Sequence, residues 1–115
     1  MKKIKYSPDA ADKLRFLKND ISEKYGVDKA KLIIKKITNN INDLSVFEKK
    51  GPAVSSLFDV VTDYRYLVVS KNYVFYRIEK DYIRIINIYN EKENFMWQLF
   101  GIDTTPQDTL DYWGE

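Results

Sequence analysis

Apolar and aromatic residues concentrate in three runs in the second half of the chain, at residues 64–70, 73–78 and 82–89. The runs are rich in Tyr, Val, Ile and Phe, which suit the pleated, half-buried surface of a β-sheet. The polar connectors at residues 71–72 and 79–81 are so short that consecutive strands must pair antiparallel. This pattern predicts a three-stranded meander around which the rest of the chain is arranged.

Both faces of the predicted sheet are mostly apolar. Side chains alternate between the two faces along a strand. The middle run therefore divides into two sets, Tyr73, Phe75 and Arg77 on one face and Val74, Tyr76 and Ile78 on the other. We expect helices to cover one face, and we expect the other face to be covered in part or to meet a partner.

Two helical patterns precede the sheet. Ser7 suits an N-cap and Pro8 suits the first helical position, and apolar residues then recur every three or four positions until Gly26. A second helix is expected from an N-cap at Asp28, with an apolar stripe that reaches Leu44. Because the connection between them is so short, the two helices must form an antiparallel hairpin with its apolar stripes toward the core.

The segments on either side of the hairpin carry weaker signals. Residues 4–6 alternate in polarity and predict an edge strand for the sheet. The segment 45–63 contains a turn signal, Gly51-Pro52, and its scattered apolar residues have no clean period. We expect at most one short strand or helical turn there, near Leu57 to Val61.

A short C-terminal helix completes the prediction. Glu91 and Glu93 fit its first turn, where carboxylates favour the helix dipole. The predicted fold is α+β: an N-terminal antiparallel helical hairpin packed on an antiparallel sheet of three or four strands, closed by this helix. Four apolar side chains of the helix would face the sheet, Phe95, Met96, Leu99 and Phe100, and Trp97 on its opposite side is a candidate for partner contact.

Length and composition exclude several classes of protein. The 115 residues suit one domain, at residues 1–101, followed by an acidic tail at residues 102–115. The chain has no cysteine and no histidine, so any catalysis must use Lys, Arg, Tyr or carboxylates. We find no apolar run that could span a membrane and no signal-peptide pattern, and therefore expect a soluble cytoplasmic protein.

Positive charge is concentrated in the first half of the chain. Residues 1–52 hold 13 Lys and Arg against 7 Asp and Glu, whereas residues 100–115 hold no Lys or Arg and 4 Asp and Glu. A basic first half could steer the chain toward nucleic acid or an acidic partner. Lysines that only keep the helix surfaces soluble explain the same pattern more simply.

The strand motifs, taken in order, resemble the closing half of the RelE/ParE family of bacterial toxins, the plasmid stabilisation type. The motifs are Tyr64-Arg65-Tyr66-Leu67, Asn72 to Ile78, and Ile83 to Ile86 leading into Asn90-Glu91 and Phe95. The start, Tyr6 to Ala10 followed by two helical patterns, also matches, so the resemblance covers roughly residues 2–101. It implies the toxin of a type II toxin–antitoxin pair, whose disordered antitoxin segment folds on binding and covers apolar sheet or helix surface.

RelE-type relatives cut messenger RNA on the ribosome without a metal ion or cofactor, using basic and aromatic side chains. That chemistry needs a base for the ribose 2′-OH, cations against the phosphate charge and an acid for the leaving oxygen. By resemblance, the cationic candidates here are Arg65, Arg77, Arg84 and Lys92. Tyr73, Tyr76 and Tyr89 could stack on RNA bases.

The ribonuclease pattern is depleted in this chain. Arg65 stands where ribonuclease members place a strand cation, but Val74 replaces the arginine of the next strand. Their Gly-Lys-Arg-rich segment becomes Tyr89 to Glu93, in which two glutamates would repel a phosphate and Lys92 is the one cation. ParE-type members share the fold, lack the basic cluster and poison DNA gyrase by binding it. The resemblance therefore favours a ParE-like toxin, with the ribosome-dependent endoribonuclease and an inactive antitoxin-binding scaffold as alternatives.

Each candidate residue also has a purely structural interpretation. Arg77 and Arg84 could pair across adjacent strands with Glu79 or Asp81 in ordinary surface ion pairs. The three tyrosines could pack the sheet and contact no RNA. The sequence leaves the target, the antitoxin's identity and the oligomeric state open.

Overall fold

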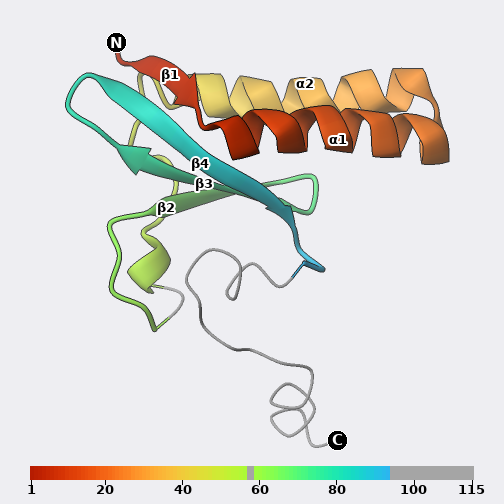
Figure 1. Cartoon of the computed structure of the whole chain (residues 1–115). Coiled ribbons are helices and arrows are strands. Elements are labelled where there is room, and N and C mark those ends of the chain that lie inside the picture. Colours follow the sequence, from red (N-terminus) through yellow and green to blue (C-terminus); the bar gives the residue numbers. More distant parts are fainter. Residues whose placement is uncertain (57–58, 94–115) are drawn as a thin grey trace, which may run out of the picture.

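The computed structural model describes residues 1–56 and 59–93 of the chain. Two helices lie side by side over one face of a four-stranded sheet (Figure 1). In chain order the elements are β1 (Lys3–Tyr6), α1 (Pro8–Tyr25), α2 (Val27–Asp43), a 3-10 turn η1 (Val54–Ser56), β2 (Arg65–Val69), β3 (Asn72–Ile78) and β4 (Tyr82–Asn90). The predicted α+β class and the helical hairpin are confirmed.

Helix α1 begins and ends as its sequence indicates. Pro8 occupies the first helical position, and the Ser7 hydroxyl accepts a hydrogen bond from the backbone N–H of Ala10 at 3.0 Å. Gly26 ends the helix with φ of 97° and donates its N–H to the carbonyl of Ser22 at 3.0 Å. Only glycine adopts this backbone conformation at little cost, so it reverses the chain within one residue.

The predicted N-cap of α2 at Asp28 is wrong. Gly26 is the N-cap, no side chain caps the helix, and Val27 is its first residue. Because the chain reverses at Gly26 alone, α2 can begin at the next residue, without a longer loop before it. Asp28 lies in the first turn instead, where its carboxylate still favours the helix dipole.

The sheet is mixed, with strand order β1-β4-β3-β2. The predicted meander is confirmed, since β2, β3 and β4 pair antiparallel in sequence. The expectation of a wholly antiparallel sheet is wrong, because β1 pairs parallel to β4 from Lys3 opposite Tyr82 to Tyr6 opposite Ile85. A short turn dictates strand direction only between sequence neighbours, and the whole chain between β1 and β4 separates these two strands.

Tight local geometry sets the register of the meander. Ser70 and Lys71 have φ of 50° and 65° and form the turn between β2 and β3, so β3 begins at Asn72 and not after it. A β-bulge follows on β4, where Phe75 pairs with Asn87 but Tyr76 pairs with Ile85. The extra residue, Ile86, shifts the alternation of β4.

The helices and the sheet share one main core. Ala10, Ile37, Ile41 and Leu44 from the hairpin side meet buried residues from all three meander strands, including Leu67, Val74, Tyr76, Ile85 and Ile88. A second cluster on the opposite sheet face contains Phe75 and Tyr89, with Val54 from η1. The two-face division predicted for β3 is therefore confirmed, and part of the second face is covered by the segment that contains η1.

The segment at residues 45–63 forms a helical turn, but earlier in the chain than we expected. The turn lies at Val54–Ser56, and residues 59–61 belong to no helix or strand. Val54 fixes this position because its side chain is completely buried against the second cluster.

The last described residues form the reciprocal hydrogen bonds of a capping box. The Asn90 side chain accepts from the N–H of Lys92, and the Glu93 carboxylate accepts from the N–H of Asn90, both at 3.0 Å. The predicted C-terminal helix, Trp97 and the tail at residues 102–115 lie outside the described residues.

Candidate functional site

Arg65 is hydrogen-bonded to the protein backbone. Its Nε donates to the carbonyl oxygen of Gly51 at 2.7 Å, and one Nη donates to that of Lys49 at 3.5 Å. Its register partner is Tyr76, so its side chain lies on the helix-covered face of the sheet. Its guanidinium group therefore holds the loop at residues 48–51 against β2.

Tyr76 completes this arrangement from the core. Its hydroxyl donates to the carbonyl oxygen of Glu48 at 2.8 Å and accepts from the N–H of Gly51 at 3.0 Å. The side chain is completely buried, and this burial raises the pKa of Tyr76 more than the Gly51 and Arg65 hydrogen bonds lower it. The ring of Tyr76 is thus enclosed by protein, where an RNA base cannot stack on it.

Arg77 and Arg84 lie opposite each other on β3 and β4, on the face away from the helices. Arg77 pairs with Asp63 at 3.1 Å and, at 3.5 Å, with Glu79, which follows the last residue of β3. Like charges in direct register are unfavourable, and these two carboxylates offset that cost. Within the described residues Arg84 forms no ion pair, and the two arginines border a shallow pocket of about 360 Å³.

Lys92 lies at the far end of the sheet. It follows the last residue of β4, whereas Arg84 is near the start of that strand. At about 3.3 Å per residue, the end of β4 at Asn90 is roughly 20 Å from Arg84. The four cationic candidates therefore occupy two faces and two ends of the sheet and do not gather into one site.

The other two tyrosines belong to an aromatic cluster on the sheet face away from the helices. Tyr73 is half-buried and stacks on Phe75, with ring centroids 6.1 Å apart. Tyr89 is 4% exposed, its hydroxyl accepts from the Asn87 amide at 3.0 Å, and Lys13 Nζ lies 5.2 Å from its ring centre. Burial is the main reason that the pKa of Tyr89 is raised.

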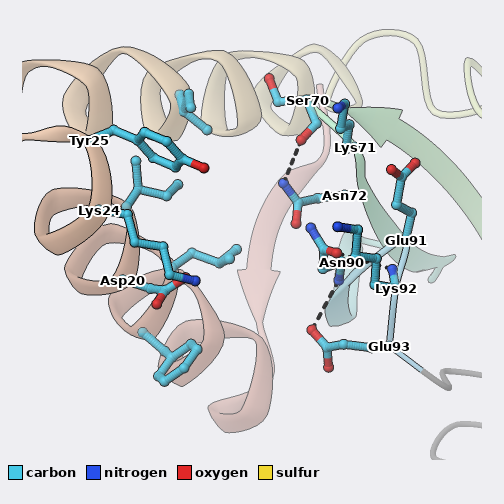
Figure 2. Close-up of a pocket in the computed structure, with 14 residues that line it drawn as sticks. Asp20, Lys24, Tyr25, Ser70, Lys71, Asn72, Asn90, Glu91, Lys92 and Glu93 are labelled. Carbon is cyan, nitrogen blue, oxygen red and sulfur yellow. Dashed lines mark hydrogen bonds and ion pairs between the residues drawn. The ribbon is translucent and has the colours of Figure 1, made fainter.

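A pocket of about 450 Å³ lies between α1 and the end of the sheet that carries the β2–β3 turn (Figure 2). Leu17 and Ile21 of α1 and Ile33 of α2 supply its apolar wall. The turn at residues 70–72 and the end of β4 at residues 90–93 supply its polar wall. This pocket has the shape of a cleft between two layers of the fold.

Asn72 is the most unusual residue of this pocket. It is 3% exposed, its side-chain Nδ2 donates to the carbonyl oxygen of Ser70 at 2.9 Å, and its Oδ1 has no hydrogen-bond partner among the described residues. Figure 2 shows its side chain pointing from β3 into the space between α1 and β4. Sequence reasoning placed Asn72 in a connector and missed it; the signal was a polar residue at the first position of a mostly apolar strand.

In residues 1–56 and 59–93, no three metal-ligating side chains of Asp or Glu lie together as a cation site would require. In the same part of the chain no helix is long and apolar enough to cross a membrane.

Comparison with known proteins identifies the family. The family model described as "ParE toxin of type II toxin-antitoxin system, parDE" matches residues 4–95. The chain belongs to the ParE toxin family. This confirms the resemblance, and with it the role of toxin component in a type II toxin–antitoxin system, in which an antitoxin is the partner.

A solved structure agrees with this assignment. The structure titled "Chromosomal ParDE TA system from P. aeruginosa" is 21% identical, covers 78% of this chain and 96% of its own, and superposes with a TM-score of 0.67. At this level of identity the likeness shows only that the two chains share a fold. No curated protein sequence matches the chain.

Proposed function

We propose that this ParE-family toxin arrests growth by binding DNA gyrase and does not cut messenger RNA. The observation that carries the proposal is the dispersal of Arg65, Arg77, Arg84 and Lys92 over two faces and two ends of the sheet. Cleavage at a ribose 2′-OH requires a base, an acid and cations within hydrogen-bond distance of one phosphate. Four dispersed cations cannot surround one phosphate.

The engagement of Arg65 adds to this argument. Its guanidinium group already donates to two loop carbonyls, at Gly51 and Lys49, so its hydrogen bonds stabilise the fold. The absence of histidine from the sequence removes the side chain best suited to general acid–base catalysis at neutral pH. A toxin of this kind acts by occupying its target.

The test combines two assays on the same purified protein. Gyrase supercoiling of a plasmid is measured with increasing toxin, and primer extension on a reporter message is measured in a purified translation reaction. We expect loss of supercoiling, restored by the antitoxin, and intact message. Codon-positioned cleavage that appears only with ribosomes would instead establish the endoribonuclease.

Two arginine variants sharpen the comparison. Arg84→Ala removes an exposed cation with no ion pair in the described part of the chain, and Arg65→Ala removes the loop-holding group. We expect Arg84→Ala to stay folded and to leave the message intact, as the wild type does. Arg65→Ala should lower thermal stability, while its folded fraction still inhibits gyrase. Expression that causes no growth arrest would indicate an inactive scaffold.

A further inference from the structure

The two helices of the hairpin carry their charges differently. Helix α1 has four acidic and four basic residues, and the ion pairs Arg15–Asp12 and Lys24–Asp20 lie within it. Helix α2 has four lysines and only two acidic residues, which stand near its two ends. Residues 29–42 of α2 therefore contain four positive charges and no carboxylate.

The four lysines of α2 are exposed and unpaired. They are Lys29, Lys31, Lys35 and Lys36. Within residues 1–56 and 59–93, none of their side chains forms an ion pair. Charges that serve solubility are best interspersed in sign, as they are on α1. The α2 lysines instead form one cationic surface, the α2 lysine face.

The placement of these lysines does not stabilise the helix. Lys31 and Lys35 are four residues apart, so their like charges repel each other on adjacent turns. Lys29 lies in the first turn, where the helix dipole disfavours a cation, and the last turn has no basic residue. The α2 lysine face is therefore unfavourable for the helix itself, and an external polyanion would offset this repulsion.

The lysines form two rows along the exposed side of α2. At about 100° per residue, Lys31 and Lys35 lie within about 40° of each other on one flank. Lys29 and Lys36 lie within about 20° of each other on the other flank, and Leu32 lies between the rows. An α-helix has about the width of the major groove of B-DNA, which is bordered by two phosphate strands. Two rows of cations match these two strands, whereas a single strand of phosphates would meet only one row.

The composition of the face suits a nucleic acid better than a protein. Between residues 29 and 42 the one large apolar side chain that is exposed is Leu32, at 51%, and the exposed residues there include Asn39 and Asn42. Protein–protein interfaces are enriched in aromatic residues and depleted in lysine, whereas protein–DNA interfaces are polar and strongly positive. These observations favour duplex DNA over an acidic protein surface.

We propose that the α2 lysine face binds the phosphate backbone of duplex DNA. Lysine–phosphate contacts position a protein on DNA and carry no direct sequence information, so the binding has little sequence preference. The contact holds the toxin on the DNA on which gyrase acts, and in this way extends the proposed function. The inference rests on the placement of charge in α2 and does not require gyrase to be the target.

The salt dependence of DNA binding tests the proposal. Fluorescence anisotropy measures the affinity of the purified toxin for a labelled duplex of about 20 base pairs, from about 50 to about 200 mM salt. Binding to B-DNA weakens with a log–log slope of about −0.9 per phosphate contacted, so four contacts predict a Kd that rises about 150-fold over this range. In the triple variant Lys31→Gln, Lys35→Gln, Lys36→Gln the rise should be only about fourfold.

A second triple variant controls for net charge. Lys3→Gln, Lys71→Gln and Lys80→Gln together remove the same charge from exposed lysines outside α2. None of these three lysines forms an ion pair in the described part of the chain. This variant should keep the wild-type slope.

Several outcomes would overturn the proposal. A wild-type slope in the α2 variant, shown to be folded by circular dichroism, would exclude the face. An equal loss in both triple variants would mean that net charge alone attracts DNA. Tighter binding to single-stranded RNA than to the duplex would assign the face to RNA. Unchanged DNA binding with reduced affinity for purified gyrase would assign it to an acidic protein surface.

Two further measurements keep the test decisive. If the triple variant does not fold, Lys35→Gln alone should make the slope shallower by about 0.9, and an unchanged slope would count against the face. Wild-type toxin that binds DNA but does not inhibit supercoiling would refute the gyrase proposal and leave this one standing. The two proposals can therefore fail separately.

Discussion

Arg65 was a candidate for catalysis and Tyr76 for stacking on RNA, but both side chains form hydrogen bonds with the backbone. The loop at residues 48–51 has carbonyl and N–H groups that no strand or helix satisfies, and buried backbone groups must find partners. Arg65 donates to Gly51, and Tyr76 both donates to Glu48 and accepts from Gly51. The two side chains thus replace secondary structure for this loop.

The buried hydroxyl of Tyr76, with those of two other tyrosines, predicts that the protein loses stability at alkaline pH. Burial raises the pKa values of Tyr6, Tyr76 and Tyr89 above their ordinary value of 10.0. Above about pH 10 the unfolded chain releases these protons while the native state retains them, so the free energy of unfolding falls as pH rises. Below pH 10 both states are protonated and this contribution to stability is complete.

Urea unfolding between about pH 8 and pH 11, a range that includes the ordinary tyrosine pKa, checks this behaviour. Tyr76→Phe should be less stable than the wild type by roughly 1–3 kcal/mol at pH 8, because the Glu48 and Gly51 groups lose their partner. It should also lose less stability than the wild type on going to pH 11. Tyr25→Phe, at an exposed position, should keep the wild-type slope; equal slopes for all three proteins would contradict the prediction.

Gly51 predicts a second effect at the scale of one residue. A Cβ atom there would overlap the carbonyl oxygen of Tyr66 and come within 3.0 Å of the Tyr76 ring. We expect Gly51→Ala to lower the free energy of unfolding by roughly 3 kcal/mol, because the loop must move away from β2. The melting temperature measures this.

Gly26→Ala is the comparison for the Gly51 variant. No atom lies within 4 Å of a Cβ built on Gly26, so only its φ of 97° is unfavourable. Its cost should be about 1–2 kcal/mol. If the melting temperature of Gly51→Ala equals or exceeds that of Gly26→Ala, the loop at residues 48–51 is free to shift.

At the scale of elements, Ser7 joins α1 to the sheet. Its hydroxyl accepts from the Ala10 N–H at 3.0 Å and donates to the Ile86 carbonyl at 2.6 Å, and its own N–H donates to the Ile85 carbonyl at 2.9 Å. One residue thus caps the helix and ties it to the bulge of β4. This link holds the N-terminus of α1 at the parallel β1–β4 pair.

Replacing Ser7 should weaken that junction. Ser7→Ala removes the cap and leaves the Ile86 carbonyl without its donor, so we expect a loss of about 2 kcal/mol in the free energy of unfolding. Ser7→Thr keeps the hydroxyl and should recover most of it. Chemical denaturation measures both variants, and an unaltered midpoint for Ser7→Ala would mean that the junction adds no stability.

At the scale of the whole molecule, the sheet lies between two hydrophobic clusters of unequal size. The main cluster draws on the hairpin and all three meander strands, and the second cluster uses the opposite face of the same strands. Neither layer has enough apolar contact to be stable alone, since the hairpin buries its stripe only against the sheet. The described domain should therefore unfold as one unit.

Thermal unfolding followed by two probes checks this cooperativity. The far-UV circular dichroism of the helices and the near-UV signal of the clustered tyrosines should change at the same temperature, as in a two-state transition. Ile37→Ala, which removes a fully buried contact of α2, should shift both signals together. Separate transitions would show that the hairpin and the sheet are independently stable.

The sequence alone determined the local features of this ParE toxin. These features are the helical period, the cap at Ser7, the end of α1 at Gly26 and the meander. They follow from interactions between residues close in the chain, so they could be predicted from the sequence. The family could be recognised for the same reason, because its members share the order and spacing of the strand motifs. The position of η1 and the start of α2 were missed where one side chain or one glycine conformation decided the boundary.

The tertiary structure alone decided the relations between distant residues. The direction of β1, the engagement of Arg65 by the Gly51 loop and the dispersal of the four cations depend on contacts between segments far apart in sequence. So does the pocket at Asn72, whose walls come from α1, α2, the β2–β3 turn and the end of β4. The sequence period indicates which face of a helix or strand a residue occupies. Only the packing of distant segments determines which other residues it contacts there.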